Sequence, residues 1–288
     1  MTVYTLLIEP FTDYAFMRRA LSAAIILSMS GAPIGVFLLL RRMTLMGDTL
    51  THAILPGVAG AYMFFGLSLW PMTLFGLLTG VLVASSAGVI AKLTSLKEDA
   101  SFTGMYLTAL AAGVLMVSLR GSPVDLMHVL FGNVLAVDNA SLLLMAGASG
   151  TTIVVMLFFL RGFTLECFDP VHLESTGSSS SFYYHTFLML IVLNVVVAFQ
   201  VLGTLMALGL MILPAIAARF WTYHIDRMIG LAMFYAIFSA FTGLLLSYHA
   251  DVPSGPSMVL TASALYFLSL LLGTHKGLLW RILPIRQK

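Results

Sequence analysis

Long stretches of sequence without a single charged residue constrain this chain more than any other feature. A helix of about 20 apolar residues crosses the roughly 30 Å hydrocarbon core of a bilayer. Only 9% of all residues are charged, whereas a soluble domain carries about 25%. These observations exclude a water-soluble globular fold and predict an integral membrane protein. The runs of about 20 residues or more that lack Asp, Glu, Lys and Arg are 20–40, 100–119, 139–160, 228–250 and 252–275.

Two further uncharged runs are longer than one membrane crossing needs. They cover residues 49–91 and 175–218, with internal breaks at Gly66–Pro71 and near Gly203. Splitting both runs predicts an all-α fold, a polytopic membrane helix bundle of eight or nine transmembrane segments in one domain over residues 1–288. Two of the segments are short for a full crossing, so one of them is expected to be a half-helix. The predicted segments are 17–40, 49–66, 70–91, 102–119, 139–160, 185–201, 203–218, 228–248 and 255–273, and the short ones are 49–66 and 203–218.

The basic residues predict the orientation of the bundle. Lys and Arg near helix ends are retained on the cytoplasmic side of a membrane. With a cytoplasmic C-terminus, 11 of the 14 basic residues fall on that side and only Arg18, Arg19 and Arg120 lie outside. We therefore expect a cytoplasmic C-terminus, which also requires residues 185–218 to form two segments and not one straight helix.

Ionisable residues inside a span are costly and are candidates for function. Asp48 and His52 are four residues apart, so they share one face of a helix. A carboxylate and an imidazole together suit first-row divalent ions such as Mn²⁺, Fe²⁺ or Zn²⁺. Two ligands hold an ion weakly, and a homodimer with this helix on its axis would supply two of each. The alternative is structural: Asp48 caps the N-terminus of a helix and His52 bonds to a neighbouring helix.

Two pairs of glycines have the spacing that brings membrane helices together. Gly31 and Gly35 form one pair, and Gly76 and Gly80 form the other. Small residues four apart let two helix backbones approach closely in lipid. We expect these four glycines to be structural.

The longest hydrophilic segment runs from residue 161 to residue 185 and faces the cytoplasm in the predicted orientation. A short amphipathic helix over 168–175 could dock there on a soluble partner. A flexible Gly/Ser linker is the alternative, because four serines follow Gly177.

Motifs of catalysis are missing from the sequence. It contains no phosphate-binding loop, no H-E-x-x-H and no G-x-S-x-G. If ATP drives transport, another polypeptide must hydrolyse it, and we expect this chain to bind no cofactor of its own. No basic stripe indicates nucleic-acid binding. The single cysteine, Cys167, excludes a disulfide framework within one chain.

Four segments in order along the chain have a specific pattern. The most specific is RRMTLMGDTLTHAILPGV over residues 41–58, which contains Asp48 and His52. DLMHVLFGNVLAV over 125–137, LMILPAIAAR over 210–219 and DVPSGP over 251–256 follow it. Together these segments resemble the manganese/zinc/iron ABC-transporter permeases of the ABC-3 type, and the resemblance covers nearly the whole chain.

The resemblance implies a type II ABC importer-like bundle in the bacterial inner membrane, surrounded by lipid. Its members form a permease homodimer, sit on two cytoplasmic ABC ATPase subunits and receive metal from an extracytoplasmic solute-binding protein. It implies that Asp48 and His52 contact the transported metal and that Phe168, Asp169 and Gly177 belong to the segment that couples to the ATPase. Leu173 and the run 178–181 depart from the family pattern in that segment.

The predicted function is the membrane permease of an importer for manganese or zinc, with iron as a further candidate. ATP binding and hydrolysis in the partner would drive alternating access. Alternatives are a permease for a metal chelate of the siderophore or cobalamin type and a proton-coupled secondary metal carrier. A carrier would normally show internal repeats, and none is convincing. A further alternative, an intramembrane hydrolase, needs a nucleophile and a base, and this arrangement is not evident in the sequence.

Overall fold

The computed structural model describes residues 7–66, 68–119, 134–275 and 277–279. Within these ranges the chain is helical and forms no strand. The helices are α2 (Glu9–Asp13), α3 (Ala15–Leu40), α4 (Thr44–Ala53), α5 (Leu55–Phe65), α6 (Leu69–Leu93), α7 (Glu98–Leu119), the short 3-10 helix η1 (Val134–Ala136), α9 (Asn139–Phe168), α10 (Pro170–Ser175), α11 (Ser180–Leu202), α12 (Thr204–Arg219), α13 (Ile225–Ala250) and α14 (Ser254–Leu272).

The predicted membrane bundle is confirmed. Among the described residues, seven helices are long and apolar enough to cross a membrane, fewer than the eight or nine segments predicted. The breaks predicted at Gly66–Pro71 and near Gly203 are present, because α5 ends at Phe65 and α11 ends at Leu202. The segment at 203–218 is α12, which has only 16 residues. The spanning helices are α3, α6, α7, α9, α11, α13 and α14.

The segment predicted at 49–66 consists of two short helices, α4 and α5, that meet at Ile54. Pro56 is the cause of the break. Proline has no backbone N–H, and its ring collides with the carbonyl four residues earlier, which belongs to His52. The helix is therefore interrupted directly after the two residues of the predicted metal site.

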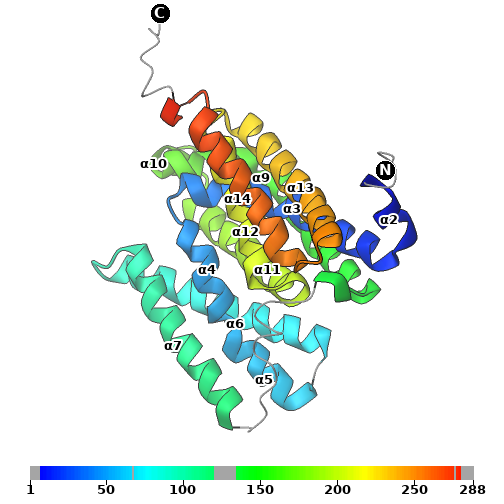
Figure 1. Ribbon diagram of the computed structural model, residues 1–288. Helices are drawn as coiled ribbons and strands as arrows, with labels where there is room; N and C mark the ends of the chain where they lie inside the picture. The colour runs from blue at the N-terminus through cyan, green and yellow to red at the C-terminus, as the bar shows by residue number, and fades with distance from the viewer. Residues whose placement is uncertain (1–6, 67, 120–133, 276, 280–288) are drawn as a thin grey trace, which may run out of the picture.

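The bundle has two flanks that share α11. Figure 1 shows α4 to α7 on one flank and α3, α9 and α12 to α14 on the other. Helix α11 packs against α6 and α4 on the first flank and against α9, α3 and α12 on the second. A large apolar cluster fills the place where the flanks meet. It includes Ile34 and Phe37 of α3, Leu50 of α4 and Ile191 of α11.

The predicted glycine contacts bring neighbouring helices together. A Cβ atom on Gly35 of α3 would collide with the backbone carbonyl oxygen of Met211 on α12. A Cβ atom on Gly80 of α6 would lie 2.6 Å from Cγ1 of Val192 on α11. Both glycines therefore occupy places where a larger side chain has no room, and the structural interpretation of the spacing is confirmed for them.

Residues 161–185 are mostly helical, which differs from the predicted hydrophilic loop. Helix α9 continues to Phe168 and α11 begins at Ser180, so the connection is short and contains α10. The prediction ended the span at the first charge, Arg161, but a helix can continue beyond the hydrocarbon. It ends instead before Pro170, because the residue that precedes a proline avoids the α conformation, and Asp169 has φ −150° and ψ 77°.

Candidate metal pathway and cytoplasmic junction

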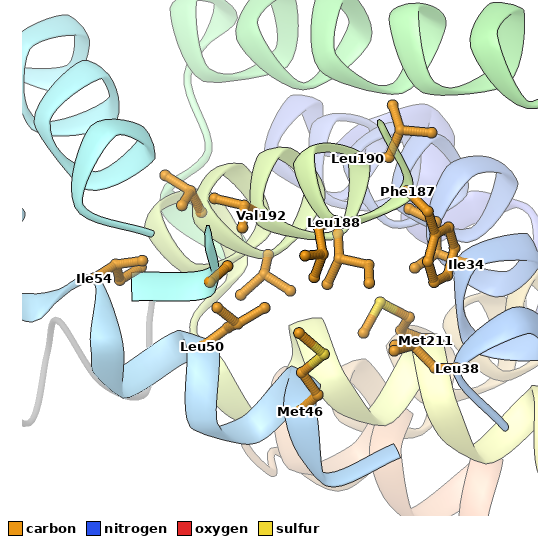
Figure 2. Close-up of a cluster of buried hydrophobic side chains, with 14 of the residues drawn as sticks. Ile34, Leu38, Met46, Leu50, Ile54, Phe187, Leu188, Leu190, Val192 and Met211 are labelled. Carbon is orange, nitrogen blue, oxygen red and sulfur yellow. The ribbon is translucent and has the colours of Figure 1, made fainter. Parts of the chain in front are cut away.

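Helix α4 buries one face and leaves the other open. Met46, Leu50 and Ile54, spaced by four residues, are at most 4% exposed. Figure 2 shows these side chains in one cluster with Leu188 of α11 and Met211 of α12. The apolar stripe therefore fixes the rotation of α4 about its axis.

Asp48 and His52 lie on the opposite face, because each stands two residues beyond a buried position and a helix turns by about 100° per residue. The Asp48 carboxylate is 60% exposed and the His52 imidazole is 33% exposed. Oδ1 of Asp48 and Nε2 of His52 are 3.9 Å apart. Two atoms bound about 2.1 Å from one ion lie roughly 3.0–3.4 Å apart, so a small side-chain rotation would let both reach a single metal.

The structure also tests the alternative in which Asp48 caps a helix. Helix α4 begins at Thr44, so Asp48 stands inside the helix and not at its N-terminus. A capping role for Asp48 is therefore wrong. The shared helix face predicted from the spacing is confirmed.

A pocket of about 340 Å³ opens beside the pair, between α4 and α12. Its wall is apolar apart from Asp48, His52 and Thr204. Helix α4 approaches α12 closely at Gly47, where a Cβ atom would lie 3.0 Å from Cδ2 of Leu208. The remaining lining residues are Leu205, Leu208, Gly209, Ile212 and Leu213 of α12 and Val259 of α14.

The pair has no third ligand in the part of the chain that the structure describes. There, no group of three or more His, Cys, Asp or Glu side chains lies close enough to hold one ion. His185 and His249 each place Nδ1 near a carbonyl of their own helix, 2.7 Å from that of Ser181 and 2.9 Å from that of Leu245. His128 lies outside the described residues. The described part of one chain thus offers two donors to a metal at this point.

The residues predicted to couple to an ATPase surround α10. The Asp169 carboxylate accepts a hydrogen bond of 2.9 Å from the backbone N–H of His172 and caps α10. Gly177 has φ +80° directly after the helix, a conformation that favours glycine. Leu173 is buried, whereas Phe168 is exposed beside it. Helix α10 is therefore held against its own chain, and the apolar side chains of Phe168 at the end of α9 and Val171 of α10 face outward.

A buried ion pair that the sequence analysis did not predict lies near this helix. Arg41, the residue after α3, pairs with Glu166 in the last turn of α9, and both side chains are 9% exposed. The Arg41 guanidinium carbon lies 5.4 Å from the ring centroid of Tyr184 and 4.9 Å from that of Phe187, both on α11. Burial lowers the pKa of Arg41, but a guanidinium stays charged at neutral pH. The sequence feature that could have indicated this pair is Glu166, a carboxylate in an apolar stretch.

The sequence profile described as "ABC 3 transport family" matches residues 13–273. The chain belongs to this family. A relative from Halalkalibacterium halodurans, "Manganese transport system membrane protein MntC", is 34% identical over 98% of this chain and 95% of its own length. "Chelated iron transport system membrane protein YfeD" of Yersinia pestis is 31% identical over 99% of this chain and 92% of its own.

A solved structure has the same fold as this ABC 3 family member. It is PsaBC from Streptococcus pneumoniae in complex with Fab, with a TM-score of 0.83 and 28% sequence identity over 96% of this chain and 98% of that chain. The predicted resemblance is thus confirmed, and so is the fold class of a polytopic permease. This ABC 3 family member is a multi-pass membrane permease.

Proposed function

We propose that this permease carries a divalent transition-metal ion, manganese or zinc with iron as a further candidate, into the cytoplasm as part of an ABC importer. The observation that carries the proposal is the Asp48–His52 pair, 3.9 Å apart on the open face of α4 beside a pocket. Relatives named for manganese and chelated-iron transport support this choice of cargo. A permease must release what it binds, and two ligands from one chain hold an ion only weakly.

A second copy of the chain would complete the site. Asp48 is 60% exposed on a wall that is otherwise apolar except for His52 and Thr204, and a carboxylate facing lipid is costly. A homodimer with α4 near its axis covers this carboxylate and supplies two Asp and two His ligands. Four ligands of this mixed type are typical of sites for first-row divalent ions.

The family supports the other partners. Two ABC ATPase subunits would bind α10, with Phe168, Asp169 and Gly177 at the contact, and would hydrolyse ATP in place of this chain. An extracytoplasmic solute-binding protein would deliver the metal on the other side. The C-terminus would then be cytoplasmic, in the inner membrane of a bacterium. Figure 1 shows α10 and the C-terminal end of α14 toward the top of the view, away from α2, which supports a common side for them.

Uptake by vesicles tests the metal ligands. The complete complex, with its ATPase and binding protein, is reconstituted and supplied with ATP and Mn²⁺, Zn²⁺ or Fe²⁺. Asp48→Ala and His52→Ala should each abolish uptake while the ATPase still assembles with the permease. His185→Ala is the matched control, because that ring bonds within its own helix. Unchanged uptake in either alanine variant at position 48 or 52 refutes the proposed ligands.

A second pair of variants tests the ATPase contact. Asp169→Ala removes the cap of α10, and Gly177→Val forces a β-branched residue into a left-handed conformation. Both should weaken copurification of the ATPase and lower transport. Full transport with normal ATPase binding in both variants would show that α10 is not the contact.

A metal chelate is the second candidate cargo, because one relative is named for chelated iron. Uptake of free Mn²⁺ and of the same ion held by a strong chelator distinguishes the two. We expect the free ion to be taken up, since a bare ion can reach a carboxylate and an imidazole and a fully chelated one cannot. Uptake of the intact chelate alone would favour the second candidate.

A further inference from the structure

Three helix ends meet at the buried Arg41–Glu166 pair. Arg41 caps the C-terminus of α3, Glu166 belongs to the last turn of α9, and the rings of Tyr184 and Phe187 come from the beginning of α11. Both charges are removed from solvent, and each therefore depends on the other for its stability. A fork-shaped guanidinium between a carboxylate and two rings has little freedom to turn.

The connection from this pair to the metal helix is short and fixed. Only Arg42 and Met43 stand between Arg41 and α4. Arg42 has φ +60°, and the Met43 N–H donates to the carbonyl of Leu38 at 2.9 Å, which closes the end of α3. A tight turn of this kind leaves little slack. The position of Arg41 therefore sets where α4 begins, and Asp48 follows one turn later.

The connection from the pair to the cytoplasmic surface is equally short. Glu166 stands three residues before Asp169, whose carboxylate caps α10. The Asp169 N–H donates to the carbonyl of Leu165 at 2.7 Å, so the helical hydrogen bonding of α9 reaches to the start of α10. Leu173 is buried and holds α10 against the bundle. A displacement of α10 must therefore displace the end of α9 that carries Glu166.

We propose that Arg41 and Glu166 are positioning residues that form the mechanical joint between α10 and the metal helix α4. This inference rests on the proposed function, because it takes α10 as the ATPase contact and α4 as the metal-binding helix. The pair binds neither ATP nor metal. The pair makes α4 and α10 move together, so that a movement of α10 driven by the ATPase changes the pocket at Asp48 and His52. A cavity of about 340 Å³ lined by Arg41, Glu166 and Met43 lies beside this joint.

The joint predicts uncoupling when one charge is removed. The complete importer in vesicles is compared in unaltered form, with Arg41→Gln, with Glu166→Gln, and with the charges exchanged, Arg41→Glu plus Glu166→Arg. Uptake and ATP hydrolysis are measured together. In each single variant we expect the number of ATP molecules hydrolysed per transported ion to rise by about tenfold or more. A buried charge without its partner is unstable, so the contact between the ends of α3 and α9 is lost. The exchanged pair should lower the number of ATP molecules hydrolysed per transported ion again. Metal affinity of the solubilised complex should stay unchanged.

Arg161→Gln is the matched control, because Arg161 is the same residue type, is exposed on α9 and does not line the cavity at the joint. Its ATP cost per ion should equal that of the unaltered complex. If Arg41→Gln fails to assemble, Arg41→Lys replaces it, since lysine keeps the charge but not the fork. A normal ATP cost per ion in the assembled single variants, or no recovery in the exchanged pair, overturns the proposal.

Failure of the joint and failure of the proposed function give different results. If the unaltered complex takes up no Mn²⁺, Zn²⁺ or Fe²⁺, the proposed cargo is wrong, and the joint is then tested without cargo. Leu208→Cys places a reporter thiol in the pocket beside Asp48. Cys167 is kept, because it lines the cavity at the joint, and the labelling of the chain with Cys167 alone is subtracted. The reactivity of the reporter thiol should change with ATP in the unaltered joint and not in Glu166→Gln. An equal response in both backgrounds overturns the joint by itself.

Discussion

Replacement of Gly35 by alanine should loosen the contact between α3 and α12, whereas the same change one turn earlier should not. A Cβ atom at position 35 would collide with the backbone carbonyl oxygen of Met211. A Cβ atom at position 31 would lie 3.4 Å from Cδ1 of Leu27 and 3.6 Å from Cγ of Met211, which is ordinary contact. Backbone cannot rotate away as a side chain can, so only the first variant must move the helices apart.

The difference between the two variants isolates the cost of this collision. Each gains the same helix propensity on going from glycine to alanine, about 1 kcal/mol, and this gain cancels in the comparison. Overpacking of a well-packed interior costs about 1–3 kcal/mol. We therefore expect Gly35→Ala to have a free energy of unfolding about 1–3 kcal/mol lower than Gly31→Ala.

Unfolding in mixed micelles of mild detergent and dodecyl sulfate, followed by circular dichroism, measures this difference. The unaltered protein serves as the reference for both variants. Gly31→Ala should be as stable as the reference or slightly more stable. Equal stabilities of the two variants would refute the reasoning, because they would mean that α3 and α12 are not in backbone contact at Gly35.

Two further predictions concern polar groups. The Asn194 side chain donates to the Thr152 hydroxyl at 2.6 Å between α11 and α9, so a double-mutant cycle with Asn194→Leu and Thr152→Val should give a coupling of about 0.6 kcal/mol, and zero coupling would contradict this bond. The Asp138 carboxylate accepts hydrogen bonds from the Ser141 side chain and from the Ser141 N–H, the latter at 2.8 Å, and these lower its pKa. Asp138→Ala should therefore cost about 1 kcal/mol near neutral pH. That cost should vanish as the pH falls through the lowered pKa of the folded state, since a protonated carboxyl caps poorly; thermal midpoints at several pH values measure this, and a pH-independent cost would exclude the cap.

The positions of the membrane helices could be predicted closely because lipid imposes a local rule. A backbone in hydrocarbon must satisfy its own hydrogen bonds, so long uncharged runs become helices. The helix breaks at 66–71 and near Gly203 also depend on the local sequence and could be predicted for that reason. The helix ends were less predictable, and α9 extends to Phe168 because a charge ends the hydrocarbon span and not the helix.

The candidate site was predictable in part. Spacing alone placed Asp48 and His52 on one face, and the structure brings them to 3.9 Å. Their role as metal ligands, and that of Phe168, Asp169 and Gly177 as ATPase contacts, stay predictions. The pocket beside Asp48 depends on α12 and α14, far away in the sequence, and no local pattern could supply it.

The sequence by itself thus determined the membrane class, the helical segments and the pairing of a carboxylate with an imidazole, because each depends on neighbours along the chain. Only the tertiary structure decided that Glu166 turns inward to Arg41 and that Gly35 touches the backbone of α12. A soluble helix marks its buried face by a change from polar to apolar residues, but lipid is as apolar as the protein interior. Which face meets protein and which meets lipid is therefore absent from the hydrophobic pattern and is fixed only when distant helices pack.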